Sequence, residues 1–186
     1  MSTKPFEQAV DSTRAVLARV SKEQLSKATP CASWKVSDLI NHFIGAQYFF
    51  MTSIEGAAPG EGGTDFSAGD FHAAFEEGIE RSLAAFSAKG AMEKMVKLPF
   101  GDMPGSAFVG LAATDTFVHG WDLAKATGQS TDLAPELAAQ LLAGARGAIQ
   151  DAFRGADGVA PFGPEQEAPA GASNADRLAA FLGRKV

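Results

Sequence analysis

The chain has 186 residues, with 16 Lys and Arg against 22 Asp and Glu, which gives a net charge of −6 at pH 7. This length predicts a single domain with a core of its own, and the acidic balance argues against a general nucleic-acid binder. The one cysteine, Cys31, excludes an internal disulfide or a multi-cysteine zinc site. There is no apolar signal-peptide segment, and the longest uncharged stretch, residues 39–54, is too short and polar to span a bilayer, so we expect a soluble, cytoplasmic protein without a membrane partner.

The first two predicted helices are marked by apolar residues that recur every three or four positions, the spacing of one helix face. The first runs from residue 6 to about residue 27, with Thr3 as a cap, Pro5 in its first turn and Ser21 as a point of interruption. The second runs from about residue 36 to residue 54. The expected inner faces are Phe6, Val10, Thr13, Leu17 and Val20 on the first helix and Leu39, His42, Phe43, Ala46, Phe49 and Phe50 on the second.

The middle of the chain predicts one loop, one helix and one extended segment. Residues 56–70 are rich in Gly and Ala, which indicates a mobile surface loop. A third helix follows over about residues 70–89. Residues 95–98 have the composition of a short strand, but a single strand has nothing to pair with, so we expect an extended crossover there. The predicted inner face of the third helix is Phe71, Phe75, Ile79, Ser82 and Phe86.

The second half of the chain predicts three more helices. The fourth runs from residue 106 to residue 126 and ends before Gly128, and the fifth opens at Pro135 and ends near Phe153. Residues 155–172 cross back to a short last helix over residues 173–182, with Ser173 as its cap and Gly183 as its stop. Long helices with almost no strand signal predict an all-α bundle.

The candidate metal ligands are two of the three histidines and one aspartate. Asp115 and His119 are four residues apart, so they project side by side from the fourth helix. An inward carboxylate and imidazole are costly without partners, and metal ligation is one way to satisfy them. His42 lies on the inner face of the second helix and is the expected third ligand. The inward stripe of the fourth helix is Phe108, Ala112, Asp115, His119, Asp122 and Ala126.

Each of these residues also has a simpler interpretation. Asp115 and His119 could form a hydrogen bond on the helix surface, and His42 could be a hydrogen-bonded core histidine. Asp122 could orient His119 through its free ring N–H or form an ion pair with Lys125. His72 is expected at the surface.

The remaining unusual side chains are a thiol and two indoles. Cys31 is expected to be a buried, inert thiol rather than a nucleophile. It lies at least three helical turns from His42 along the chain, which is roughly 15 Å if the helix starts close to Cys31 and less if the loop folds back. The two tryptophans are expected in the core or at the rim of a pocket; they are Trp34 and Trp121.

Several of these segments resemble one known family. The motifs are Thr29-Pro30-Cys31 with Trp34, residues 38–42 (DLINH), residues 119–124 (HGWDLA) with 126–128, residues 161–164 and residues 176–184. Together they resemble actinobacterial metal-binding proteins related to the mycothiol-dependent maleylpyruvate isomerase, within the DinB-like superfamily. The resemblance spans nearly the whole chain except the loop at 56–70.

The resemblance implies a DinB-like four-helix bundle over residues 1–186, with residues 129–186 as a C-terminal helical extension. It also implies a divalent metal, zinc first and nickel or iron as alternatives, held by His42, Asp115 and His119. Asp115 stands where the isomerase has a glutamate, and nothing here resembles the isomerase's additional C-terminal domain.

The implied function is a metal-dependent thiol transferase or isomerase that activates a low-molecular-weight thiol such as mycothiol. The expected partners are this thiol and a small electrophilic substrate, with a homodimer left open. The alternatives are a non-catalytic bundle that binds a metal or small ligand, a non-haem iron oxygenase, and a metal-dependent hydrolase.

Overall fold

The computed structural model of the protein describes residues 2–31, 33–58, 63–156 and 159–186. The short 3₁₀ helices are η1 (Lys22–Gln24), η2 (Phe66–Ala68) and η3 (Asp151–Phe153), and strands β1 (Met95–Val96) and β2 (Met103–Pro104) form one antiparallel hairpin. The fold is all-α apart from this small hairpin within the described residues, as predicted. The α-helices are α1 (Lys4–Leu17), α2 (Val36–Glu55), α3 (Phe71–Ser87), α4 (Gly105–Thr127), α5 (Pro135–Ala148) and α6 (Asn174–Phe181).

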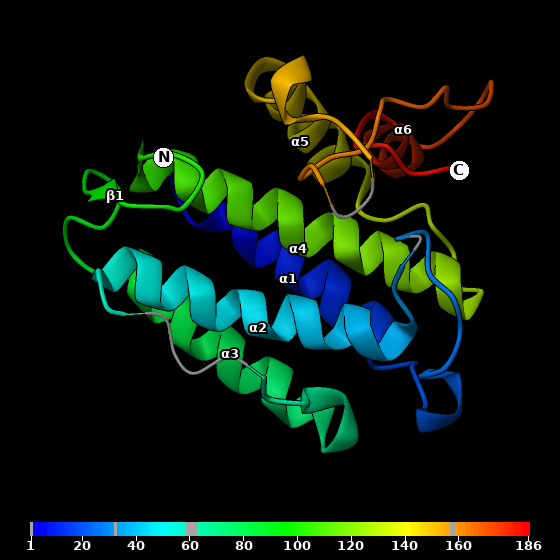
Figure 1. The fold of residues 1–186 in the computed structure, drawn as a ribbon, viewed down its shortest axis with the longest axis horizontal. Helices are drawn as coiled ribbons and strands as arrows, with labels where there is room; N and C mark the ends of the chain where they lie inside the picture. The colour runs from blue at the N-terminus through cyan, green and yellow to red at the C-terminus, as the bar shows by residue number, and fades with distance from the viewer. Residues whose placement is uncertain (1, 32, 59–62, 157–158) are drawn as a thin grey trace.

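Helices α1 to α4 form the bundle, and α5 and α6 lie beside α4 on the side away from α3 (Figure 1). Helix α1 packs against α4 and α3, and α2 packs against α3 and α4. Each of the four helices supplies one phenylalanine to a common aromatic cluster with ring centroids 5.4–6.4 Å apart. Burial of side chains of this size drives the packing of the bundle. The cluster consists of Phe6, Phe50, Phe86 and Phe108.

The predicted inner faces account for most of this core. Every predicted inner residue of α1 and α3 is buried. On α2 the prediction holds for Leu39, Phe43 and Phe50, whereas His42, Ala46 and Phe49 remain partly exposed. The prediction therefore identified the correct helix faces, and the exposed part of α2 is where the candidate site opens.

Helix α1 approaches α4 closely at Gly120, directly after His119. A Cβ atom built on Gly120 would lie 2.3 Å from Oγ1 of Thr13, so any larger residue there would push the two helices apart. The hydroxyl of Thr13 donates a hydrogen bond to the backbone carbonyl of Thr116 at 2.8 Å. This close contact fixes one face of α4 against α1 and turns the face with His119 toward α2.

A buried polar layer crosses the bundle through one side chain from each helix; we call it the core polar layer, and it consists of Thr13, Gln47, Ser82 and Thr116. The amide of Gln47 donates to Oγ1 of Thr116 and to the carbonyl of Phe43, both at 3.2 Å. Its oxygen accepts from the hydroxyl of Ser82 at 3.0 Å. All four side chains are fully buried, and their hydrogen bonds offset the cost of removing them from water.

The N-terminal part departs from the prediction where side chains cap new turns. Helix α1 ends at Leu17 rather than near residue 27. The predicted interruption at Ser21 is confirmed, because Ser21 and Gln24 form a capping box that starts η1. Thr3 occupies the N-cap position of α1, but its hydroxyl donates to Glu7 and makes no backbone cap. These differences shorten α1 by about three turns of the predicted helix without changing its buried face.

The predicted loop at residues 56–70 is only partly described, since residues 59–62 lie outside the described residues. Its second half contains η2, which Asn41 of α2 holds by accepting from the backbone N–H of Ser67 at 2.9 Å and donating to Asp65 at 3.0 Å. This part of the loop is therefore attached to the bundle.

The expectation of an unpaired extended crossover at residues 95–98 is wrong. Met95 pairs with Pro104 and Val96 with Met103, so the turn-rich segment that follows supplies the partner strand. Two-residue strands carry too little alternation to be recognised from sequence.

Helix α4 ends as predicted, with Gly128 in the left-handed conformation after Thr127. Helix α5 ends at Ala148 instead of near Phe153, because Ile149 adopts an extended conformation and η3 follows separately. The glycines at positions 144 and 147 weaken the last turn of the predicted helix.

The C-terminal helices are tied to α4 by polar contacts. The indole N–H of Trp121 donates to Asp176 of α6 at 2.9 Å, and Ser173 caps α6 by accepting from the backbone N–H of Asp176, as predicted. The side chain of Asn174 donates to the carbonyl of Pro135 at the start of α5. In the described part of the chain, none of the helices combines the length and apolar composition needed to cross a bilayer.

Candidate metal centre

The structure brings the three predicted ligand residues together between α2 and α4. Nε2 of His119 lies 3.5 Å from Oδ1 of Asp115, and Nε2 of His42 approaches the same oxygen at 3.8 Å. The two imidazole rings are in edge contact, with centroids 4.6 Å apart. We call His42, Asp115 and His119 the candidate metal centre.

The centre is buried on one side and open on the other. The side chain of His119 is 8% exposed, that of Asp115 is 28% exposed and that of His42 is 38% exposed. Oδ2 of Asp115 is nevertheless buried, and it is the one buried side-chain nitrogen or oxygen of the described residues without a hydrogen-bond partner. An unsatisfied buried carboxylate oxygen is costly, so this atom marks a place where a cation or donor would be stabilised.

The donor set fits a divalent metal ion. One ligand atom from each residue lies within 4.8 Å of the others. A tetrahedral zinc ion with bonds of about 2.1 Å holds its ligand atoms about 3.4 Å apart, so small side-chain movements would bring these atoms to bonding distance. Two imidazoles and one carboxylate also match a common zinc ligand set that leaves a position open. These three residues could therefore hold the metal that the sequence predicts.

The other ring nitrogen of His119 is held from behind by Asp122. Nδ1 lies 3.0 Å from Oδ2 of Asp122, whose side chain is fully buried. Asp122 in turn accepts from Arg184, at 3.0 Å between Nη2 and Oδ2 and 3.3 Å between Nε and Oδ1. A carboxylate on the second nitrogen of a ligand histidine sets the orientation and tautomer of the ring. Asp122 therefore orients His119, and the ion-pair partner of Asp122 is Arg184 rather than Lys125.

Charges around His119 reinforce this arrangement. Burial alone would lower the pKa of His119, but the charge of Asp115 and the hydrogen bonds that the ring makes with Asp115, Asp122 and Cys31 raise it well above its ordinary value. Burial would raise the pKa of Asp115, but His119 and His42 hold it well below its usual range. Burial acts in the same way on Asp122, and Arg184 together with His119 keeps its pKa low. Asp115 in the centre and Asp122 behind it therefore both stay ionised, and the charge of Asp115 attracts a cation.

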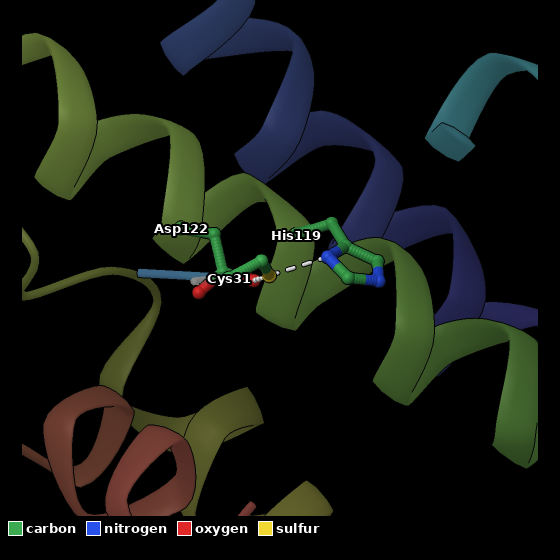
Figure 2. Close-up of side chains that lie close together, drawn as sticks. All are labelled: Cys31, His119 and Asp122. Carbon is green, nitrogen blue, oxygen red and sulfur yellow. Dashed lines mark hydrogen bonds and ion pairs between the residues drawn. The ribbon is translucent and has the colours of Figure 1, made fainter. Parts of the chain in front are cut away.

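Cys31 lies beside this cluster, so the separation expected for a continuous helix is wrong and the loop folds back instead. Its Sγ donates to Oδ2 of Asp122 at 3.3 Å and lies 3.7 Å from Nη2 of Arg184. Figure 2 shows Cys31 facing His119 and Asp122, which project from the same side of α4. The segment before α2 folds back over α4 because Thr29 donates hydrogen bonds from its backbone N–H and from its hydroxyl to the carbonyl of Trp34. A distance counted along a continuous helix could not include this turn.

Cys31, His119 and Asp122 form a second group whose ligand atoms lie within 4.8 Å of one another. The guanidinium of Arg184 already contacts both Asp122 and Cys31. Burial would lower the pKa of Arg184, but Asp122 raises it above its ordinary value, so Arg184 stays charged and repels a second cation. Of the two groups, the candidate metal centre is therefore the better place for a metal ion.

Trp34 lies over the open side of the candidate metal centre. Its ring centroid is 4.6 Å from that of His42 and 5.8 Å from that of His119. Of the two predicted positions, Trp34 takes the rim of the site, whereas Trp121 is fully buried in the core. His72 is exposed on α3, as predicted.

Sequence reasoning assigned no role to Arg184. The signal that could have found it is a buried Asp122 on the inward stripe, which requires a cation, and an arginine directly after the predicted helix stop at Gly183. The two residues are 62 positions apart, so only the fold brings them together.

Comparisons with known proteins agree with this architecture. The family model described as the mycothiol maleylpyruvate isomerase N-terminal domain matches residues 6–124, a range that contains the candidate metal centre and Asp122. Two uncharacterized proteins from strains of Mycobacterium tuberculosis are each 41% identical to the chain over 184 residues, covering 97% of this chain and 96% of their own. No solved structure matches the chain.

Proposed function

Because this chain belongs to the family of the mycothiol maleylpyruvate isomerase N-terminal domain, we propose that it uses a divalent ion and a low-molecular-weight thiol such as mycothiol in an S-transfer or isomerisation reaction. In this proposal His42, Asp115 and His119 hold the ion, with zinc as the expected metal, and the second substrate is a small electrophile. The observation that carries the proposal is the buried, unpartnered Oδ2 of Asp115 beside two imidazole nitrogens.

The metal would supply the activation of the thiol. Only about 3% of a free thiol with a pKa near 8.5 is ionised at pH 7, whereas a thiol coordinated to a divalent cation is deprotonated. Three protein ligands leave at least one coordination position for such an external group.

The protein's own residues would hold and shield this chemistry. Asp122 orients His119 through Nδ1, which leaves Nε2 on the side of His42 and Asp115. Trp34 packs beside both imidazoles and restricts the access of water to them. His42 is the most exposed of the three residues, so it lies at the side from which a substrate would enter.

Cys31 is not the nucleophile in this proposal. Its Sγ contacts Asp122 on the Nδ1 side of His119, whereas Asp115 contacts Nε2. The thiol that reacts therefore comes from a bound substrate, and Cys31 serves packing and hydrogen bonding.

The experiment measures product formation from a panel of electrophiles, including maleylpyruvate, by the zinc-loaded protein with and without mycothiol. We expect turnover that requires both zinc and added thiol, is lost in His119→Ala and is retained in Cys31→Ser. Turnover that survives without added thiol but disappears in Cys31→Ser would make Cys31 the nucleophile. Tight thiol binding without turnover would instead support a non-catalytic binding bundle.

A further inference from the structure

Arg184 is the cation that balances the buried carboxylate of Asp122. Its guanidinium uses two nitrogens on two oxygens, with Nη2 3.0 Å from Oδ2 and Nε 3.3 Å from Oδ1. The side chain of Arg184 is 12% exposed and that of Asp122 is 0% exposed, so this pair is screened from water. Two parallel contacts of this kind hold the carboxylate in one plane and stabilise its negative charge.

The turn at Gly183 delivers Arg184 to this position. Gly183 has φ 95°, and a Cβ atom on it would lie 2.6 Å from Cα of Gly163, so both the conformation and the close approach require glycine. The backbone N–H of Arg184 then donates to the carbonyl of Ala179 at 2.9 Å, and its Nη1 donates to Leu182. The chain therefore leaves α6 with the arginine pointing back toward α4.

The same oxygen of Asp122 serves both Arg184 and His119. Oδ2 lies 3.0 Å from Nη2 of Arg184 and 3.0 Å from Nδ1 of His119. Removing the guanidinium would leave Asp122 without the two contacts that fix its plane, so the carboxylate would be free to rotate away from Nδ1 of His119. Such a rotation alters the contact that orients His119.

We propose that Arg184 is a positioning residue for the candidate metal centre: it holds Asp122 against Nδ1 of His119 and thereby keeps Nε2 directed at His42 and Asp115. The inference rests on the function proposed above. It also gives the C-terminal segment a role in the site, because Arg184 lies beyond residues 6–124, the part matched by the family model.

The test compares Arg184→Met, which removes the positive charge, with Arg184→Lys, which keeps the charge but loses the two-nitrogen contact with Asp122. Arg177→Met is the matched control, because Arg177 is exposed on α6, the helix that precedes Arg184. The first readout is the nitrogen-15 NMR signal of the His119 Nδ1–H group in the metal-free protein. We expect it in the wild type and in the control, shifted or broadened in Arg184→Met, and partly restored in Arg184→Lys.

The second readout is zinc affinity, measured by competition with a chromophoric chelator. Loss of an outer partner of a metal-bound histidine weakens binding by about 10- to 100-fold, so we expect Arg184→Met to bind zinc about 10-fold more weakly, with Arg184→Lys between it and the wild type. Asp122→Asn should weaken binding similarly, and the double variant should lose little more than Asp122→Asn alone, because both changes act through one contact.

Additive losses in the double variant, or an unchanged Nδ1–H signal in Arg184→Met, would show that Arg184 only anchors the C-terminal segment. If Arg184→Met does not fold, Arg184→Lys provides the test. An unchanged His119 Nδ1–H signal and an unchanged zinc affinity in Arg184→Lys would overturn the proposal. If the wild type binds no zinc, the proposed function fails, while the NMR comparison still decides whether Arg184 positions His119.

Discussion

The core polar layer and the candidate metal centre both include residues of α2 and α4, and they differ in how their polar atoms are satisfied. In the core polar layer, the amide of Gln47 uses both N–H groups and its oxygen, and Thr13, Ser82 and Thr116 are fully buried around it. In the candidate metal centre, Oδ2 of Asp115 is buried without a partner. Adjacent residues of one helix, Asp115 and Thr116, therefore belong to opposite kinds of polar site.

This difference distinguishes a polar site that stabilises the fold from one that can bind a ligand. A fully paired buried network specifies how helices pack and leaves nothing for a ligand to contribute. A buried group that lacks one partner at the edge of the bundle costs stability unless something binds there. Changes in the core polar layer should therefore alter stability, and changes in the candidate metal centre should alter metal binding.

The largest expected effect is the complete loss of metal in His119→Ala. This substitution removes the ligand that both Asp115 and Asp122 hold in place, so purified protein should contain no stoichiometric ion by elemental analysis. His72→Ala is the control, because His72 is exposed on α3 and should leave metal content unchanged. A variant that lacks His119 and still retains one bound ion would place the site elsewhere.

Gln47→Ala should destabilise the fold and spare the metal. It removes the hydrogen bonds that Gln47 makes with Ser82, Thr116 and the Phe43 carbonyl and opens a cavity, so the free energy of unfolding in urea should fall by about 2–4 kcal/mol. Gln8→Ala, at an exposed position of α1, should change it by less than about 0.5 kcal/mol. Loss of metal in Gln47→Ala while the protein stays folded would remove the distinction between the two sites.

Chelation should lower the thermal midpoint of the metal-loaded protein without unfolding it at room temperature. An ion at 100 times its Kd stabilises the folded state by about 2.7 kcal/mol, which corresponds to roughly 5–10 °C for a domain of this size. The circular dichroism spectrum should remain helical after chelation, because the aromatic cluster does not depend on the ion. Complete unfolding would identify a structural metal.

A smaller effect concerns Asp176, a satisfied carboxylate outside the bundle. Burial would raise the pKa of Asp176, but hydrogen bonds from Trp121, Thr131 and Ser173 hold it below its ordinary value. A lowered pKa in the folded state stabilises the protein above the unfolded value, near 3.9, and this contribution is lost as the pH falls through the folded pKa.

The free energy of unfolding should therefore decrease as the pH falls below about 4, and less steeply in Asp176→Asn than in the wild type. The measurement is a urea titration at several values of acidic pH. Equal slopes in both proteins would show that the Trp121 contact with Asp176 contributes nothing to acid stability.

Local sequence patterns predicted the helices and the inward stripe of α4, because the buried face of a helix appears in the sequence as apolar residues that recur about every 3.6 positions. They predicted that Asp115 and His119 share a face and that His42 lies on the opposing helix. They failed where contacts join distant segments: the return of Cys31 over α4, and the pairing of β1 with β2.

Arg184 illustrates the limit most clearly. Its partner Asp122 lies 62 positions earlier, and the contact depends on the turn at Gly183 and on how α6 packs beside α4. No periodicity links such residues. A buried carboxylate without a nearby cation in sequence indicates that such a partner exists, but only the fold identifies it.

The most direct test of the account is a calorimetric titration of the metal-free wild-type protein with zinc, followed by the same titration of Asp115→Ala. The account predicts one equivalent of zinc bound by the wild type and none bound tightly by Asp115→Ala, because Asp115 contacts both histidines and carries the unpartnered oxygen. Equal zinc binding by the two proteins, or none by the wild type with nickel and iron(II) also failing to bind, would contradict it.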